Sequence, residues 1–238
     1  MALGQEDFIE LVKTGSLEEV KRAIEAGANV NARDEIGMTP LMWAAGANQN
    51  PEVIKVLLEA RANVDARDEN GRTPLMCAAE ANQNPEVIKV LLEAGAEINA
   101  RDESGRTPLM WAAGWNENPE VIKVIKVLLE AGANVDARDE NGWTPLMWAA
   151  CLNQNPEVIK VLLEAGAEVN SRSENGLTPL MCAAGANQNP EVIKVLLEAG
   201  ADGKIRCKNG KTAFDYAKEN KHLQNTEVYW LLNDAQYL

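Results

Sequence analysis

The sequence predicts an all-α solenoid, a single elongated domain built from repeated pairs of short helices. The stretch NQNPEVIKVLLEA occurs at residues 48–60, 82–94, 153–165 and 187–199, and a longer variant, NENPEVIKVIKVLLEA, occupies 116–131. Thr-Pro-Leu begins at residues 39, 73, 107, 144 and 178, which gives spacings of 34, 34, 37 and 34 residues. A fixed period between about 20 and 50 residues is typical of repeat proteins whose similar units stack side by side.

Each unit is expected to hold two helices joined by a short loop and followed by a hairpin-like turn. In the repeat at residues 35–68, Thr39 is the expected N-cap of the first helix, and Pro40 occupies the first position of that helix. Asn50 and Pro51 play the same parts for the second helix. A glycine in the left-handed position after that helix ends it, and a polar hairpin with glycine near its tip leads to the next unit.

Two short helices cannot bury their apolar faces alone, so we expect neighbouring units to stack into a continuous core. The N-terminal segment, residues 1–34, is more polar than the repeats and carries a capping box, Ser16 with Glu19. The last unit is expected to close the core with five apolar side chains, Phe214, Tyr216, Val228, Trp230 and Leu231.

The expected organisation is a capping repeat at each end and five internal repeats between them. The N-terminal cap spans 1–34, the repeats span 35–68, 69–102, 103–139, 140–173 and 174–207, and the C-terminal cap spans 208–238.

Two positions interrupt the regular pattern. The third repeat duplicates Val-Ile-Lys at 121–126, and three added residues turn a helix by about 300°. We expect the helix to grow at its N-terminal end and to displace the loop at 116–119, with a bulge inside the helix as the alternative. Arg61 replaces the glycine after the second helix of the first repeat, at an expected cost of about 1 kcal/mol.

Composition and charge exclude several classes of function. The chain has 23 Lys and Arg against 36 Asp and Glu, a net charge of −13, and no basic stripe, so we expect no nucleic-acid partner. No apolar run approaches the roughly 18 residues of a membrane span, so no membrane partner is expected. The opening stretch MALGQEDFIELVK lacks the pattern of a signal peptide, so a cytoplasmic protein is expected.

Residues with catalytic or metal-binding chemistry are sparse. The four cysteines lack zinc-site spacing and are interpreted as small apolar side chains. His222 is the only histidine, and no nucleophile motif accompanies it. Hairpins such as DARDENG resemble a calcium loop, but Ala66 stands where an acid is required, so their acids are interpreted as turn residues and solvated charge. We expect no enzyme, no cofactor and no metal.

TPLMWAA, LLEAGANVDARDENG and the order of hairpin and two helices resemble the ankyrin repeat family, which carries Thr-Pro-Leu-His-x-Ala at a period of about 33 residues. The resemblance covers essentially the whole chain. It implies a concave groove, lined by hairpin tips and first helices, that binds partner proteins. The family histidine, which hydrogen-bonds the hairpin, is replaced by methionine in all five repeats, at residues 42, 76, 110, 147 and 181, so those bonds must be replaced or lost.

The positions that vary between copies fall where the resemblance places the groove, and many carry Trp or Arg, which are favoured at binding hot spots. We expect Trp115 and Trp143 to be exposed anchors. For Trp43, Trp111 and Trp148, exposure and burial against a neighbouring repeat both remain open. The candidate partner-binding residues are Ile36, Met38, Trp43, Arg72, Glu80, Arg106, Trp111, Trp115, Trp143, Trp148, Leu152 and Leu177.

Trp111, Trp115, Trp143 and Trp148 come from adjacent repeats and could form one apolar patch flanked by Arg72 and Arg106. The function expected is binding of a protein whose identity the sequence does not give. The near-identity of the repeats favours an engineered or consensus-derived scaffold. The alternatives are a natural ankyrin repeat protein with young repeats, and a structural scaffold that self-associates weakly through the tryptophan patch.

Overall fold

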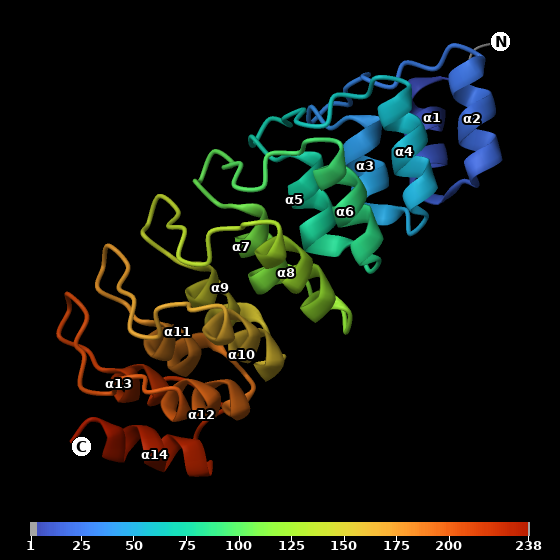
Figure 1. Cartoon of the computed structure of the whole chain (residues 1–238). Helices are drawn as coiled ribbons and strands as arrows, with labels where there is room; N and C mark the ends of the chain where they lie inside the picture. The colour runs from blue at the N-terminus through green and yellow to red at the C-terminus, as the bar shows by residue number, and fades with distance from the viewer. Residues whose placement is uncertain (1–3, 238) are drawn as a thin grey trace. The chain divides into compact units, whose positions relative to one another are not determined.

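The computed structural model describes residues 4–237, which form fourteen helices and no β-strand (Figure 1). This confirms the all-α fold class. Residues 1–3 and 238, which the expected caps include, lie outside the described part of the chain. None of the described helices combines the length and the apolar character that a membrane crossing needs.

The chain divides into two compact units. The first contains the residues up to Ala112 together with Asn118–Ala133, and the second contains Ala113–Glu117 and the residues from Asn134 onward. The helices of the first unit are α1 (Gln5–Thr14), α2 (Leu17–Glu25), α3 (Pro40–Ala47), α4 (Pro51–Glu59), α5 (Pro74–Ala81), α6 (Pro85–Glu93) and α8 (Val121–Glu130). Helix α7 (Pro108–Trp115) begins in the first unit and ends in the second. The second unit continues with α9 (Pro145–Leu152), α10 (Pro156–Glu164), α11 (Pro179–Ala186), α12 (Pro190–Glu198), α13 (Ala213–Ala217) and α14 (Glu227–Ala235).

The predicted helix starts are confirmed. The Thr39 hydroxyl accepts a hydrogen bond from the Met42 N–H, and Pro40 begins α3. The Asn50 side chain accepts one from the Glu52 N–H, and α4 begins at the next residue. These caps satisfy amide groups that have no partner inside a helix, so they fix where each helix begins.

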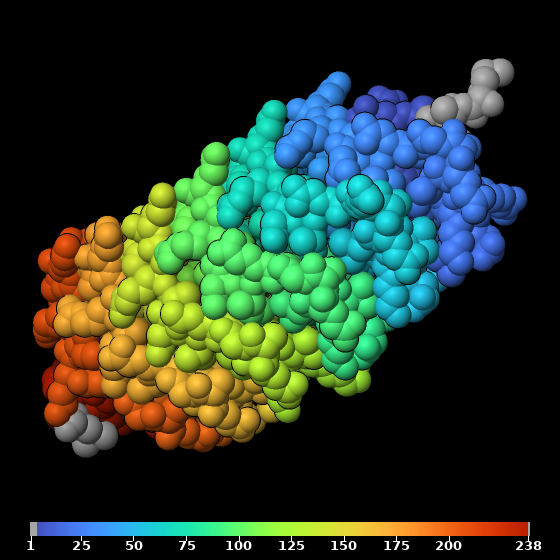
Figure 2. Space-filling model, turned by 45° about the horizontal axis from the view of Figure 1, so that its top comes forward, coloured from blue at the N-terminus to red at the C-terminus, as the bar shows by residue number. Residues whose placement is uncertain are grey.

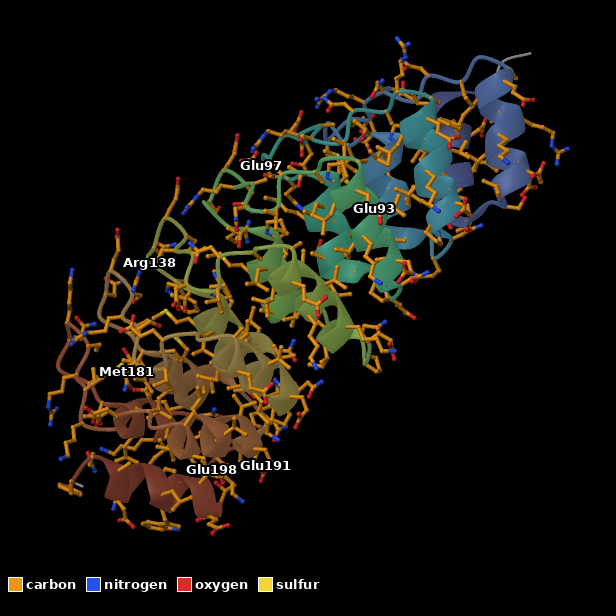
Figure 3. The ribbon with its side chains drawn as sticks, viewed as in Figure 1. Glu93, Glu97, Arg138, Met181, Glu191 and Glu198 are labelled. Atoms are coloured by element: carbon orange, nitrogen blue, oxygen red, sulfur yellow. The ribbon has the colours of Figure 1, made fainter. Side chains whose placement is uncertain are left out.

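Each unit has a core formed by layers of equivalent helices. In the first unit α1, α3 and α5 pack in succession, as do α2, α4, α6 and α8. In the second unit α9, α11 and α13 form one layer and α10, α12 and α14 the other. The methionines that replace the family histidine are buried in this core, with exposures of 0 to 2%; Met181 is labelled in Figure 3. At the position of the family histidine, a buried methionine therefore fills the core with apolar contacts.

Within each unit, a buried asparagine joins a repeat to the one before it. The Asn82 side chain donates to the carbonyls of Ala45, at 2.7 Å, and Asn48, at 3.0 Å. Asn187 does the same in the second unit, donating to Ala150 and Asn153, each at 2.9 Å. These carbonyls lie at the C-terminal end of the preceding repeat's first helix, where partners inside the helix are lacking. Consecutive repeats are therefore linked by polar as well as apolar contacts.

The inserted Val-Ile-Lys lengthens its helix by only one residue. Helix α8 has 10 residues, against nine in α4 and α6, and it begins at Val121, so Pro119 now lies in a turn before the helix. The prediction of growth at the N-terminal end, with displacement of the loop, is confirmed, and α8 contains no bulge. Val124, Ile125 and Leu128 are fully buried, as are Val53, Ile54 and Leu57 of α4. The second copy of the duplicated segment therefore takes the regular place.

Arg61 adopts the left-handed conformation that the sequence predicts, with a φ of 68°. The equivalent residue of the next repeat, Gly95, has a φ of 89°. Since only glycine enters this region freely, Arg61 is held in a strained conformation.

The expected closure of the C-terminal core is wrong in two residues. Phe214 and Val228 are buried and Tyr216 is half-buried, but Trp230 is 59% and Leu231 39% exposed. Thr226 caps α14, so positions 228 and 232, one turn apart, point toward the core. Leu232, at 1% exposure, therefore takes the expected place of Trp230 and Leu231.

Candidate functional site

An aspartate at the start of the hairpin organises three of the five variable tryptophan or cysteine positions. Asp102 accepts the Ser104 and Arg106 amides with Oδ1, each at 2.9 Å. Its Oδ2 accepts the indole N–H of Trp111, at 3.2 Å. Asp34 and Asp139 bind the indoles of the tryptophans nine residues later in the same way, at 2.8 and 3.0 Å. One carboxyl group therefore fixes both the hairpin backbone and the ring orientation.

The hairpin tips of the first unit project from the surface as separate knobs (Figure 2). Glu35, Glu69 and Glu103 are exposed there, one on each tip. The Glu69 N–H donates to the Ile36 carbonyl at 3.2 Å, and the Glu103 N–H donates to the Asn70 carbonyl at 2.9 Å. Each tip is therefore held in register with the tip before it.

An apolar hollow of about 400 Å³ opens between the first two repeats of the first unit. Ile36 lies at its rim, 50% exposed, and half-buried Trp43 and buried Met38 form part of its wall. Arg72 and Glu80, which form an ion pair, line it as well. Five of the predicted site residues thus surround one hollow that could receive an apolar side chain.

Cys77 also lines this hollow and behaves as an apolar side chain. It is 4% exposed, and burial raises the pKa of its thiol to about 12, although Arg72 nearby acts in the opposite direction. The thiol is therefore neutral near pH 7, as the interpretation of the cysteines requires.

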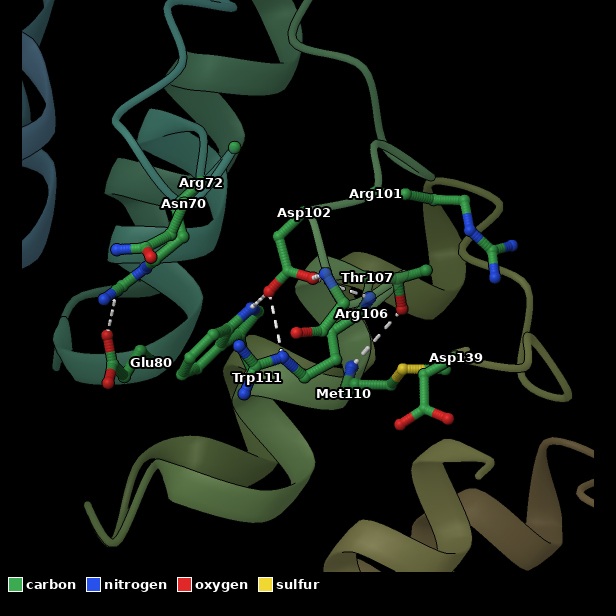
Figure 4. A network of polar contacts seen from close by, with 12 residues as sticks. Asn70, Arg72, Glu80, Arg101, Asp102, Arg106, Thr107, Met110, Trp111 and Asp139 are labelled. Atoms are coloured by element: carbon green, nitrogen blue, oxygen red, sulfur yellow. Dashed lines mark hydrogen bonds and ion pairs between the residues drawn. The ribbon is translucent and has the colours of Figure 1, made fainter. Parts of the chain in front are cut away.

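Two arginines cover the ring of Trp111 (Figure 4). The guanidinium carbon of Arg72 lies 4.5 Å from the ring centroid, and that of Arg106 lies 4.3 Å from it. Arg106 also donates to Asp102 at 2.9 Å. Trp111 is only 6% exposed, so of the two alternatives for this residue the structure shows burial. Arg72 and Arg106, the expected polar neighbours of the tryptophan patch, thus both pack on Trp111.

Three tryptophans form one cluster in the second unit. The ring centroid of Trp148 lies 4.7 Å from that of Trp115 and 4.7 Å from that of Trp143. Gly114 permits this approach, because a Cβ there would come within 3.3 Å of the Trp148 Cβ. Leu152, 37% exposed, ends α9 close to Gly114. We call Trp115, Trp143 and Trp148 the tryptophan cluster.

The expectation that Trp115 and Trp143 are exposed is wrong in degree. Both are half-buried, because each packs one side against Trp148. Trp43 and Trp148 are also half-buried, which lies between the alternatives left open for them. Trp111 belongs to the first unit and the tryptophan cluster to the second.

The last variable repeat is different in character. Leu177 is half-buried, and its N–H donates to the Ser173 hydroxyl at 3.1 Å. Ser173 stands where the other repeats have aspartate, and buried Cys182 stands where three of them have tryptophan. This repeat therefore contributes an aliphatic side chain and no ring.

Sequence reasoning missed the role of the aspartates. The sequence predicts solvated turn residues, yet Asp102 and Asp139 are 5% and 6% exposed. Their turn role is confirmed, but their second oxygen serves the indole. The constant spacing of nine residues between aspartate and tryptophan is a signal that could have identified the pairing.

The comparison with known protein families agrees with this architecture. The family model for ankyrin repeats, in three copies, matches residues 8–102, 99–173 and 150–237. The chain therefore belongs to the ankyrin repeat family, whose members are generally protein–protein interaction modules and typically not enzymes. No curated protein matches the chain. Among residues 4–237, no three His, Cys, Asp or Glu side chains come together as metal ligands would.

Proposed function

We propose that this chain is a non-enzymatic module that binds a protein partner through its variable surface. The observation that carries the proposal is the hollow of about 400 Å³ between Ile36, Trp43 and Arg72. Complete burial of one leucine or phenylalanine side chain contributes roughly 1.5–3 kcal/mol. The hollow suits such a side chain, and the Arg72–Glu80 ion pair on its wall supplies polar groups for orientation.

The tryptophan cluster supports the same function on the second unit. Trp143 and Trp115 keep part of their surface in solvent, and Leu152 extends the apolar area. Trp and Arg are the residues most enriched among binding hot spots. The core and cap residues of the repeats are nearly constant, while these positions vary. This distribution supports a consensus-derived or engineered binding scaffold, with a natural ankyrin repeat protein as the alternative.

A selection experiment tests the proposal without knowledge of the partner. Protein fragments displayed on phage are selected on the full chain, and their dissociation constants are measured by calorimetry for the wild type, Ile36→Ala and Trp143→Ala. We expect at least one of the two substitutions to cost about 2 kcal/mol or more, roughly a thirtyfold loss of affinity. Trp230→Ala is the matched control, because Trp230 is 59% exposed on α14, outside the proposed surface.

Fragments whose affinity depends on neither Ile36 nor Trp143 would contradict the proposal. Circular dichroism of each variant confirms that a loss of binding is not a loss of fold.

Self-association is the second candidate, and the exposed apolar area at Leu152 and Trp143 favours it. Sedimentation across a range of concentrations, on the wild type and on Trp115→Ala/Trp143→Ala, distinguishes the two. A wild-type dimer that becomes a monomer in the variant means that the tryptophan cluster binds a second copy. A monomer in both leaves the cluster available to another protein.

A further inference from the structure

In the first unit, the two tryptophans whose indole N–H is bound by an aspartate also make cation–π contacts. The Lys13 ammonium lies 4.1 Å from the ring centroid of Trp43. Arg72 and Arg106 lie 4.5 and 4.3 Å from that of Trp111. A cation within about 6 Å of an aromatic centroid is attracted by the negative face of the ring. The repeat therefore presents its indole in an orientation that a guanidinium or ammonium group can cover.

Trp143 occupies the place of Arg106 in the next repeat. Both residues precede Thr-Pro-Leu, and both lie over the tryptophan five residues later, Arg106 at 4.3 Å and Trp143 at 4.7 Å. Within residues 4–237, no cation lies over the ring of Trp143 or Trp148. Trp143 is half-buried, so part of its ring faces solvent.

Carboxyl groups on the hairpin before Trp143 and on the next hairpin favour a cationic ligand. Glu140 and Glu174 are exposed, and neither forms an ion pair in the described part of the chain. Glu174 is held against the hairpin that leads into Trp143: its N–H donates to the Asn141 carbonyl at 3.0 Å, and a Cβ at Gly142 would lie 3.3 Å from the Glu174 Cγ.

The arginines of these hairpins donate to backbone carbonyls. Arg138, labelled in Figure 3, donates to Gly142 at 3.1 Å and to Arg172 at 2.6 Å. Arg172 in turn donates to Arg206 at 2.7 Å. Among residues 4–237, Glu140 and Glu174 form no ion pair with either arginine, and their exposed carboxyl groups are open to a basic ligand.

We propose that the tryptophan cluster binds an arginine side chain of a basic protein segment, with the guanidinium stacked on the outer part of Trp143 and within reach of Glu140 or Glu174. This inference rests on the proposed function and names the chemistry of the partner. A second copy of the chain fits less well, since each copy carries a net charge of −13 and like charges repel.

The test uses the full chain and two synthetic peptides, an arginine–glycine repeat and the same peptide with citrulline in place of arginine. Citrulline keeps the shape of arginine and removes its charge. Dissociation constants are measured for the wild type, for Trp143→Leu, and for the control Trp230→Leu. We expect the arginine peptide to bind Trp143→Leu about two- to fivefold more weakly than the wild type and Trp230→Leu. For the citrulline peptide, we expect Trp143→Leu and the wild type to bind equally.

The difference between the two peptides isolates the contact, as in a double-mutant cycle. An equal effect of Trp143→Leu on both peptides, or an equal loss in Trp230→Leu, would overturn the inference. A wild-type dimer that Trp143→Leu dissociates would overturn it as well, because a second copy then covers the cluster. The citrulline comparison on the wild type remains decisive if Trp143→Leu does not fold, since equal binding of the two peptides also overturns the inference.

The phage selection shows whether a negative result refutes only arginine binding or also the proposed protein-binding function. Selected fragments that need Trp143 but contain no arginine or lysine leave the proposed function intact and refute the inference. Fragments that bind the wild type, Ile36→Ala and Trp143→Ala with equal affinity refute the proposed function itself.

Discussion

Replacing Asn82 by alanine is expected to lower the stability of the protein by about 3 kcal/mol. The side chain is fully buried and donates to the carbonyls of Ala45 and Asn48, at 2.7 and 3.0 Å. Its oxygen accepts the Asn84 N–H at 2.8 Å. Each lost hydrogen bond costs about 1 kcal/mol, and a buried group left without a partner costs about 1–3 kcal/mol. The three bonds together support the figure of about 3 kcal/mol.

Urea unfolding followed by circular dichroism measures this change, with the midpoint and the slope compared between variants. The matched control is Gln83→Ala, because Gln83 is the exposed neighbour, and we expect it to lie within about 0.5 kcal/mol of the wild type. Asn82→Asp separates hydrogen bonding from volume. It keeps the size and the acceptor but places an oxygen opposite two carbonyls, so we expect it to cost at least as much as alanine.

A result in which Asn82→Ala unfolds at the same urea concentration as Gln83→Ala would refute this reasoning. The hydrogen bonds of the buried amide would then contribute nothing measurable to stability. Asn187→Ala repeats the test in the second unit, where the donated bonds are each 2.9 Å long.

Two further predictions concern backbone strain and pH. Arg61→Gly should raise the urea midpoint by the equivalent of about 1 kcal/mol, because the φ of 68° suits glycine, whereas Gly95→Ala should lower it by about as much. No change in Arg61→Gly would show that the residue is not strained. The Lys218 ammonium, 2.8 Å away, and the Thr212 N–H lower the pKa of Asp215 from 3.8 to about 2. A carboxyl group whose pKa is lowered by folding stabilises the protein above its unfolded pKa, so this contribution should disappear as the pH falls from 3.8 to about 2. A carboxyl carbon titration by NMR checks the value, and a midpoint near 3.8 would contradict it.

The helices were predictable because their starts are written locally. Thr-Pro and Asn-Pro place a cap and a first helical residue next to each other, and the repeat period fixes the order of the elements. The insertion at α8 was predictable in direction for the same reason. Its extent was not, because three residues were added and only one joined the helix, while Pro119 and Glu120 formed a turn.

The candidate site was predictable as a set of positions but not as a set of contacts. Variation between copies pointed to Trp111 and Trp143, yet it could not show that one is covered by two arginines and the other by a second tryptophan. These outcomes depend on which side chain precedes Thr-Pro-Leu in the same repeat and in its neighbour. The C-terminal cap was less predictable still, because Trp230 and Leu232 differ by half a helical turn in a segment without a repeat to compare.

The pairing of Asp34, Asp102 and Asp139 with tryptophan restricts how these repeats can be diversified. A tryptophan at this position brings an N–H that the carboxyl oxygen accepts, so replacement of the ring alone leaves a charged oxygen facing apolar neighbours. Where Ser173 stands in place of aspartate, the corresponding residue is Cys182, which needs no strong acceptor. The second repeat keeps Asp68 although Cys77 takes the place of tryptophan, and there the Arg72 side chain lies 3.9 Å from the Cys77 sulfur. A combinatorial library that replaces this tryptophan should therefore offer the buried position either a weaker acceptor, as Ser173 does beside Cys182, or a neighbouring cation, as Arg72 does beside Cys77.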